Sequence, residues 1–165
     1  MKIIVNDTNI LIDLISIDLF DDFLKLNFEF HTNDLIINEI TELHQKEIIN
    51  DAIAKNNLFV TETKAEDYPG IIALMTKNLS FEDCSIWHYT KKVKGVLLTG
   101  DAKLRKSVEN DNIEARGILF IFDKLVENKI VSLTKVSEKL NKLASINTRL
   151  PKREIEKRLA QWKNE

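Results

Sequence analysis

Short apolar runs alternate with longer amphipathic segments along this chain. The runs 3–5 and 96–98 contain only aliphatic residues, which is typical of strands buried on both faces of a parallel sheet. Residues 28–32 alternate between apolar and polar side chains, as a half-buried strand does. We predict strands over residues 2–6, 28–32, 96–98 and 112–116, and a short strand or extended piece over 58–61.

Between these runs, apolar residues recur at helical spacing. The first predicted helix carries Ile10, Leu11, Leu14 and Ile15, and a later one, capped by Asn33 or Asp34, carries Ile36, Ile37, Ile40 and Leu43. Further helices are predicted over 19–26, 47–56, from Pro69 to about Lys77, from Ser80 onward, and over 102–110, 117–128, 133–146 and 152–162. Strands that alternate with helices predict an α/β fold with a parallel sheet.

Carboxylates stand at or near the starts of several helices. Asp7 directly follows one predicted strand, and Asp101 closely follows another. Asp83 opens a predicted helix, and Glu39 lies near the start of a different one. Because a parallel sheet brings such junctions to one edge, we expect these four side chains to meet there. Each alone has a plainer explanation as a helix cap, and Ser80 with Asp83 fits a capping box.

Grouped carboxylates predict a metal site. At about 4 Å and an effective dielectric near 20, each like-charge pair costs roughly 4 kcal/mol, which a hard divalent cation relieves. Mg²⁺ and Mn²⁺ prefer oxygen ligands, and a metal held by carboxylates can promote phosphodiester hydrolysis. Cys84 and His88 share a helical face, but without a second cysteine a zinc site is not expected.

Composition indicates the size and cellular location of the protein more clearly than it indicates the reaction. With 165 residues, 44% of them hydrophobic, we expect one domain, or one domain with a short appendage. The net charge of -2 means that a nucleic-acid partner would need a local basic face or a metal ion. A single cysteine, and no apparent signal peptide or bilayer-spanning run, predict a cytoplasmic protein without membrane partners.

Four motifs in order carry a resemblance to a known family. They are Val5-Asn6-Asp7-Thr8-Asn9, Ile37-Asn38-Glu39, Leu79-Ser80-Phe81-Glu82-Asp83 and Leu98-Thr99-Gly100-Asp101. Over roughly residues 2–131, including Gly117-Ile118-Leu119, the chain resembles the PIN-domain family. No single motif is specific for this family, whereas the four motifs in this order and at these separations are specific for it.

The resemblance implies a three-layer α/β/α fold with a small parallel sheet. It also implies a PIN-like domain over residues 1–131 and a C-terminal helical extension over 132–165, packed on or beside it. Many family members are Mg²⁺- or Mn²⁺-dependent ribonucleases, often VapC-type toxins. The resemblance implies that the catalytic, metal-binding acids are Asp7, Glu39, Asp83 and Asp101. It also implies that Thr8, Asn9 and Thr99 support these acids.

Two basic residues beside Asp101 and one departure from the family complete the predicted site. Lys103 and Arg105 are expected to contact the RNA backbone, which positions substrate without reading its sequence. Many relatives carry a further acid two or three residues after the fourth, where this chain has Lys103 and Leu104. One firmly held metal ion is therefore the safer prediction, and the choice between one and two ions stays open. Glu82 is a weaker candidate to replace the missing acid.

The leading hypothesis is a metal-dependent endoribonuclease, the toxin of a toxin–antitoxin pair. Its implied partners are RNA, an antitoxin protein and a second copy of the chain. The alternative is a non-catalytic PIN-fold module with a nucleic-acid-binding or regulatory role. A small-molecule phosphatase is disfavoured, because no Asp-x-Asp motif follows the first strand.

Overall fold

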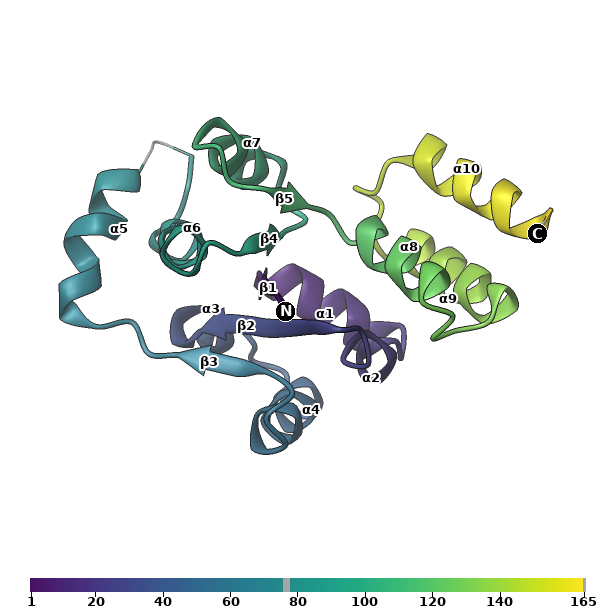
Figure 1. Ribbon diagram of the computed structural model, residues 1–165, viewed down its shortest axis with the longest axis horizontal. Coiled ribbons are helices and arrows are strands. Elements are labelled where there is room, and N and C mark those ends of the chain that lie inside the picture. The colour runs from purple at the N-terminus through teal and green to yellow at the C-terminus, as the bar shows by residue number, and fades with distance from the viewer. Residues whose placement is uncertain (76–77, 165) are drawn as a thin grey trace.

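The computed structural model of the protein describes residues 1–75 and 78–164. Within them, five parallel strands form one sheet in the order β3-β2-β1-β4-β5. The strands are β1 (Lys2–Asn6), β2 (Phe28–Asn33), β3 (Phe59–Thr61), β4 (Val96–Leu98) and β5 (Ala115–Arg116). The aliphatic β1 is central: Ile4 pairs with Phe30 of β2 on one side and with Val96 of β4 on the other (Figure 1).

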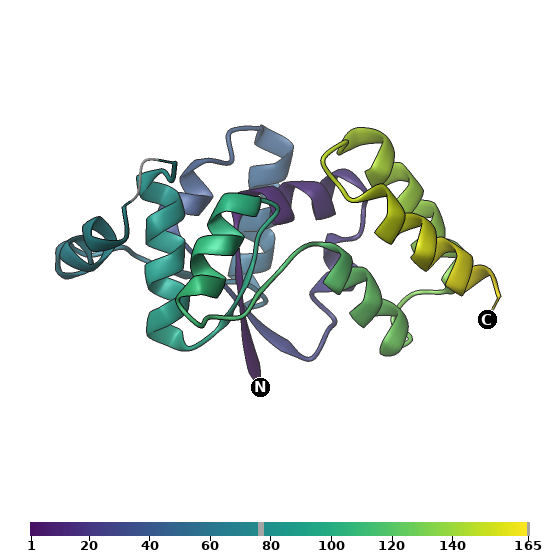
Figure 2. The same cartoon turned by 90° about the horizontal axis from the view of Figure 1, so that it is seen from above.

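Helices connect the strands and continue beyond the last one. They are α1 (Thr8–Ser16), α2 (Phe20–Phe23), α3 (Asp34–Asn38), α4 (Leu43–Ala54), the 3-10 turn η1 (Ala65–Asp67), α5 (Tyr68–Leu74), α6 (Phe81–Val93), α7 (Ala102–Asn110), α8 (Leu119–Glu127), α9 (Leu133–Ile146) and α10 (Lys152–Lys163). Seen from two directions, α5 lies at one end of the molecule and α10 at the other (Figures 1 and 2).

Successive strand residues point into two different hydrophobic clusters. Ile4 belongs to a cluster with buried side chains of α1, α2, α4, α8, α9 and α10. Val5, the next residue, belongs to a second cluster with buried side chains of α3, α5, α6 and α7. The period of two along β1 therefore places a helical layer on each face of the sheet. This arrangement confirms the predicted three-layer α/β/α fold.

The C-terminal helices share the larger cluster. Val136 and Leu140 of α9 and Trp162 of α10 are buried together with Leu14 of α1. Arg158 joins α10 to α8 by an ion pair with Asp123. The predicted division of the chain at residues 131 and 132 stays a prediction, and Glu165 lies outside the described residues.

One predicted helix ends sooner than expected. The apolar stripe predicted a helix carrying residues from Ile36 to Leu43, but α3 ends at Asn38 and Leu43 is 69% exposed. The stripe is interrupted because a second helix, α4, begins at Leu43. Glu42 caps this helix by accepting hydrogen bonds from the backbone N–H groups of His44 and Gln45. Consequently Glu39 lies just after the end of α3. The predicted end of another helix, at Lys77, lies outside the described residues.

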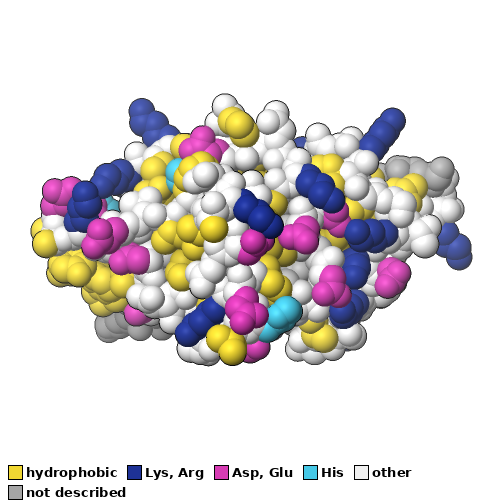
Figure 3. Space-filling view, turned by 90° about the horizontal axis from the view of Figure 1, so that it is seen from below, with side chains coloured by type: hydrophobic (Ala, Val, Ile, Leu, Met, Phe, Trp, Pro, Cys, Tyr) yellow, Lys and Arg dark blue, Asp and Glu magenta, His cyan; other side chains and the backbone are white. Residues whose placement is uncertain are grey.

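The surface carries charges of both signs. Figure 3 shows acidic and basic side chains interspersed over one face and apolar side chains gathered at the end occupied by α5. There Tyr68, Ile72 and Met75 are exposed. Within the described ranges, no helix has the length and apolar character needed to span a bilayer.

Candidate functional site

Two neighbouring strands end side by side at the candidate site. Asn6, the last residue of β1, pairs with Leu98, the last residue of β4. The backbone N–H of Asp7 donates to the carbonyl oxygen of Leu98 at 3.0 Å. Asp7 and Thr99 are therefore held next to each other at the carboxyl edge of the sheet, where ligands bind in parallel α/β folds.

Asp7 is a buried carboxylate with two hydrogen bonds. Its side chain accepts from the backbone N–H of Thr8 at 2.8 Å and from the Thr99 hydroxyl at 2.6 Å, and the residue is only 5% exposed. Burial raises the pKa of Asp7 above its usual value. The two hydrogen bonds oppose this increase, and the charges of Asp83 and Asp101 add to it.

Helix capping does not by itself account for the environment of Asp7. An ordinary cap accepts from the second or third helical residue, whereas Asp7 accepts from Thr8, the first residue of α1. Its second carboxylate oxygen is bonded to Thr99, a residue 92 positions away. The fold thus desolvates this carboxylate and keeps it near two other acids, at a cost to the charged form.

Glu39 is connected to Asp7 through Thr8. The hydroxyl of Thr8 lies 3.2 Å from Oε1 of Glu39, to which it donates, while the Thr8 backbone donates to Asp7. Burial raises the pKa of Glu39, the bond from Thr8 opposes this, and the charges of Asp7, Glu82 and Asp83 raise it further. Glu39 therefore belongs to the same electrostatic group as Asp7.

Asp83 and Asp101 each make local helix-capping bonds. Asp83 forms the predicted capping box, accepting from the Ser80 N–H at 2.9 Å while its own N–H donates to the Ser80 hydroxyl at 3.0 Å. Asp101 accepts from the N–H groups of Lys103 and Leu104, both at 2.8 Å. Both side chains are half-buried. Their capping roles are thus real, and their charges still reach Asp7.

We call Asp7, Glu39, Asp83 and Asp101 the acidic edge. Asp7 and Asp83 raise the pKa of Glu39, and Asp83 and Asp101 raise that of Asp7, so Asp7 and Glu39 are each affected by two of the other three charges. Across residues 1–75 and 78–164, no three or more His, Cys, Asp or Glu side chains are grouped so that they could hold a metal ion. The four acids of the acidic edge therefore do not gather around one ion position in this structure, and their role as a metal site stays a prediction.

The chemistry of these donors nevertheless fits a hard cation. Mg²⁺ is usually held by one or two protein carboxylates and keeps several water molecules, so a closed cage is not required. A divalent cation would also relieve the cost of keeping the Asp7 and Glu39 carboxylates charged where they are desolvated.

The other predicted residues surround the acidic edge. Thr8 and Thr99 hydrogen-bond to its acids, and the Thr99 hydroxyl also accepts from the Asp101 N–H at 3.1 Å. Asn9 is half-buried beside Gly100. The Lys103 side chain is exposed, and Arg105 donates to the carbonyl oxygen of Thr99 at 3.0 Å. Their proposed contacts with substrate stay predictions.

Replacing Thr99 with Val is expected to lower the free energy of unfolding by roughly 1–3 kcal/mol, because a carboxylate oxygen and an N–H lose their buried partner. Urea unfolding measures the change. Thr90→Val is the matched control: the Thr90 hydroxyl is also buried but donates only to the Ile86 carbonyl of its own helix. Equal unfolding midpoints for the two variants would contradict the assigned role of Thr99.

Sequence reasoning missed residues that approach the site from the C-terminal helices. Asn147, at the end of α9, donates to Asp13 of α1 at 2.8 Å. Burial raises the pKa of Asp13, which the bond from Asn147 and the charge of Arg149 oppose. The two partners are 134 positions apart, and no local pattern signals such a contact.

Comparison with protein-family models gives a match. A family model described as a PIN domain matches residues 3–164. No curated protein matches the chain.

Proposed function

Because the chain belongs to the PIN-domain family, whose members are generally nucleases, we propose that it is a metal-dependent endoribonuclease that hydrolyses RNA phosphodiester bonds. The single observation that carries this proposal is the environment of Asp7. It is buried, lies close enough to Asp83 and Asp101 for their charges to raise its pKa, and is not placed as an ordinary cap. Such a group costs stability, which is typical of functional carboxylates.

In this proposal Asp7, Glu39, Asp83 and Asp101 hold one Mg²⁺ or Mn²⁺ ion. The bound ion supplies water activation and neutralises charge that develops on the phosphodiester. Thr99 fixes the orientation of the Asp7 carboxylate through its 2.6 Å bond, and Thr8 holds Glu39 toward Asp7. With the acids fixed by these hydroxyls, few rotamers have to be ordered when the ion and the substrate bind.

Substrate binding is assigned to basic side chains beside the acids. Lys103 and Arg105 lie two and four residues after Asp101, on the first turns of α7. Phosphate contacts from such residues position a nucleic acid and carry no sequence information. Asn9, two residues after Asp7, is proposed to support the site from α1.

The test is cleavage of a labelled single-stranded RNA by the purified protein. We expect cleavage with Mg²⁺ or Mn²⁺, none with excess EDTA, and recovery when the divalent ion is restored. Asp22→Asn serves as the protein control, because Asp22 is a buried acid of α2 held by Lys25 and Lys135 rather than part of the acidic edge. Cleavage that persists in EDTA would overturn the metal-dependent mechanism.

The second candidate is a PIN-fold module that binds nucleic acid or regulates without turnover. It is favoured by the local capping roles of Asp83 and Asp101 and by the absence, among the described residues, of any three acids grouped so that they could hold a metal ion. Calorimetric titration with Mn²⁺ separates the two. A binding signal that Asp7→Asn removes supports the nuclease, and the lack of any signal supports the non-catalytic module.

The finer biological proposal is that the chain is the toxin of a toxin–antitoxin pair and acts in the cytoplasm. Growth arrest on induced expression, relieved by Asp7→Asn, would support it. An antitoxin partner and a homodimer stay predictions. Light scattering on the purified protein gives the molar mass, which decides whether the chain forms a homodimer.

A further inference from the structure

A cavity of about 550 Å³ lies beside the acidic edge. Its lining includes Asn9 of α1, two residues after Asp7, and Gly100, directly before Asp101, together with Arg105 of α7 and Ile118. The connection between α9 and α10, residues 147–151, contributes further lining residues. Segments that are far apart in the sequence thus enclose a space of the size in which proteins bind small organic groups.

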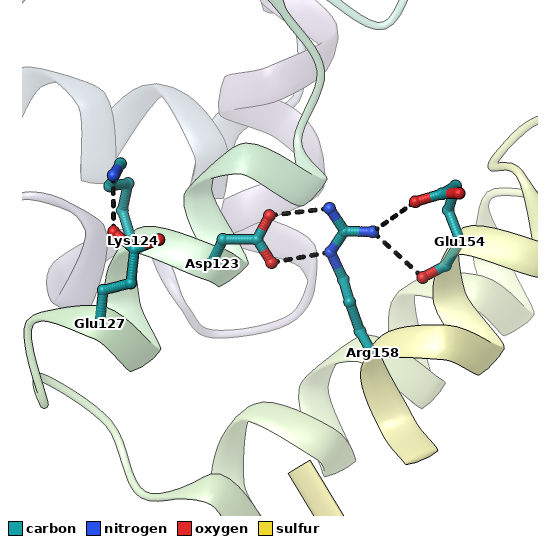
Figure 4. A network of polar contacts seen from close by, with 5 residues as sticks. All are labelled: Asp123, Lys124, Glu127, Glu154 and Arg158. Atoms are coloured by element: carbon teal, nitrogen blue, oxygen red, sulfur yellow. Dashed lines mark hydrogen bonds and ion pairs between the residues drawn. The ribbon is translucent and has the colours of Figure 1, made fainter. Parts of the chain in front are cut away.

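Four arginines line this cavity, and two of them are neutralised. Arg116 lies 3.1 Å from Glu114, and Arg158 contacts both Asp123 and Glu154. Figure 4 shows the Arg158 guanidinium between these two carboxylates. The pair between Arg158 and Asp123 connects α10 to α8, and together these ion pairs leave little charge on either arginine for a ligand.

The other two, Arg105 and Arg149, form no ion pair within the described part of the chain. Arg105 donates to the Thr99 carbonyl, while its Nε is buried without a hydrogen-bond partner. Its guanidinium occupies space that only glycine leaves open: a Cβ at Gly117 would lie 2.9 Å from it. Arg149 is exposed on the α9–α10 connection.

Local bonds hold the connection that carries Arg149. Asn147 donates to Asp13 of α1, and its side-chain oxygen accepts from the Arg149 N–H at 3.2 Å. Asp13 and Glu109 also line the cavity, so its charge is mixed. Asp13 is engaged by Asn147, and Arg149 acts on it only through longer-range charge. The backbone at Arg149 is therefore positioned, while its guanidinium remains available.

We propose that this cavity holds the RNA strand next to the scissile bond, with Arg105 and Arg149 binding its phosphates and Ile118 and Leu150 lining the space beside the sugar. The inference rests on the proposed nuclease function and extends it to the C-terminal helices. Two unpaired arginines suit phosphate because guanidinium donors match its oxygens. On this view α9 and α10 complete the substrate site.

Arg149→Gln tests the inference, with Arg153→Gln as the matched control, because Arg153 is also exposed but does not line the cavity. Fluorescence anisotropy with a labelled single-stranded RNA in EDTA measures binding apart from cleavage. We expect Kd to rise about 5–10-fold for Arg149→Gln, and the slope of log K against log salt to weaken by about 0.7. Arg153→Gln should stay within about twofold of the parent.

Each outcome separates this inference from the nuclease proposal. A parent protein that binds RNA through Arg149 but never cleaves it supports phosphate binding in the cavity and overturns the nuclease proposal. A parent that cleaves RNA while the two variants behave alike overturns the cavity and keeps the nuclease. A parent that binds no RNA overturns the cavity as well. Thermal melting checks that Arg149→Gln stays folded.

Discussion

Replacing Asp7 with Asn is expected to reduce RNA cleavage about 1,000-fold and, at neutral pH, to make the folded protein more stable. The loss of activity follows because one ligand of a metal ion contributes several kcal/mol to the reaction, and each 1.36 kcal/mol changes a rate tenfold. The gain in stability follows because burial and two neighbouring acids disfavour the charged form of Asp7.

The local bonds of Asp7 allow this substitution. An Asn oxygen can still accept from the Thr8 N–H, as Asp7 does at 2.8 Å. Its amide can donate to the Thr99 hydroxyl, which reverses the present bond and keeps the two side chains hydrogen-bonded, although the Thr99 hydroxyl proton loses its present acceptor. The variant should therefore fold, and its inactivity can be assigned to the missing charge.

The pH dependence of stability follows from the direction of the pKa shift. The folded protein raises the pKa of Asp7 above its value in the unfolded chain. The contribution of Asp7 to the free energy of unfolding is therefore fully present below the unfolded pKa, and it is lost as the pH rises through the folded pKa. Asp7→Asn should remove that loss. The Tm difference between the variant and the parent should accordingly be small at acidic pH and grow toward neutral pH.

Asp22→Asn provides the opposite case. Asp22 is buried too, but its ion pairs with Lys135 and Lys25 outweigh burial and lower its pKa. This control should lose stability at neutral pH and keep its activity. Calorimetric melting and single-turnover cleavage of the same samples measure both quantities. An Asp7→Asn variant that cleaves RNA at the parental rate would remove Asp7 from the mechanism.

Short-range patterns predicted most of the fold because buried strands and capped helices leave local signals. The aliphatic runs at Ile3–Val5 and Val96–Leu98 correspond to β1 and β4, the neighbouring strands at the middle of the sheet. The Ser80–Asp83 capping box lies where α6 begins. The order of acids along the chain, combined with the rule that parallel strands share an edge, predicted where the candidate site lies.

Interactions between distant segments were beyond this reasoning. The stripe from Ile36 to Leu43 suggested one helix, yet the Glu42 cap starts another, because a local cap can end a pattern that periodicity alone would extend. The bond between Asn147 and Asp13 depends on how α9 packs against α1. Such packing is fixed by the whole hydrophobic cluster, which no single stretch of sequence contains.

Replacing Asp101 with Asn is expected to lower cleavage about 100-fold while stability changes by less than about 1 kcal/mol. Asp101 both caps α7 and carries a charge that acts on Asp7, so the two roles have to be separated. Asn and Ser cap helices about as well as Asp, although loss of the negative charge at a helix start removes a few tenths of a kcal/mol.

Three variants at this position therefore distinguish a cap from a ligand. Asp101→Asn and Asp101→Ser keep an acceptor for the Lys103 and Leu104 N–H groups and lose the charge, whereas Asp101→Ala loses both and should cost about 1 kcal/mol. If Asp101 acts on the metal, all three lose activity alike and only Ala melts clearly earlier. If it is only a cap, Asn and Ser keep cleaving at the parental rate and Ala fails only where it unfolds. Melting curves and single-turnover rates at one temperature, well below every Tm, decide between these results.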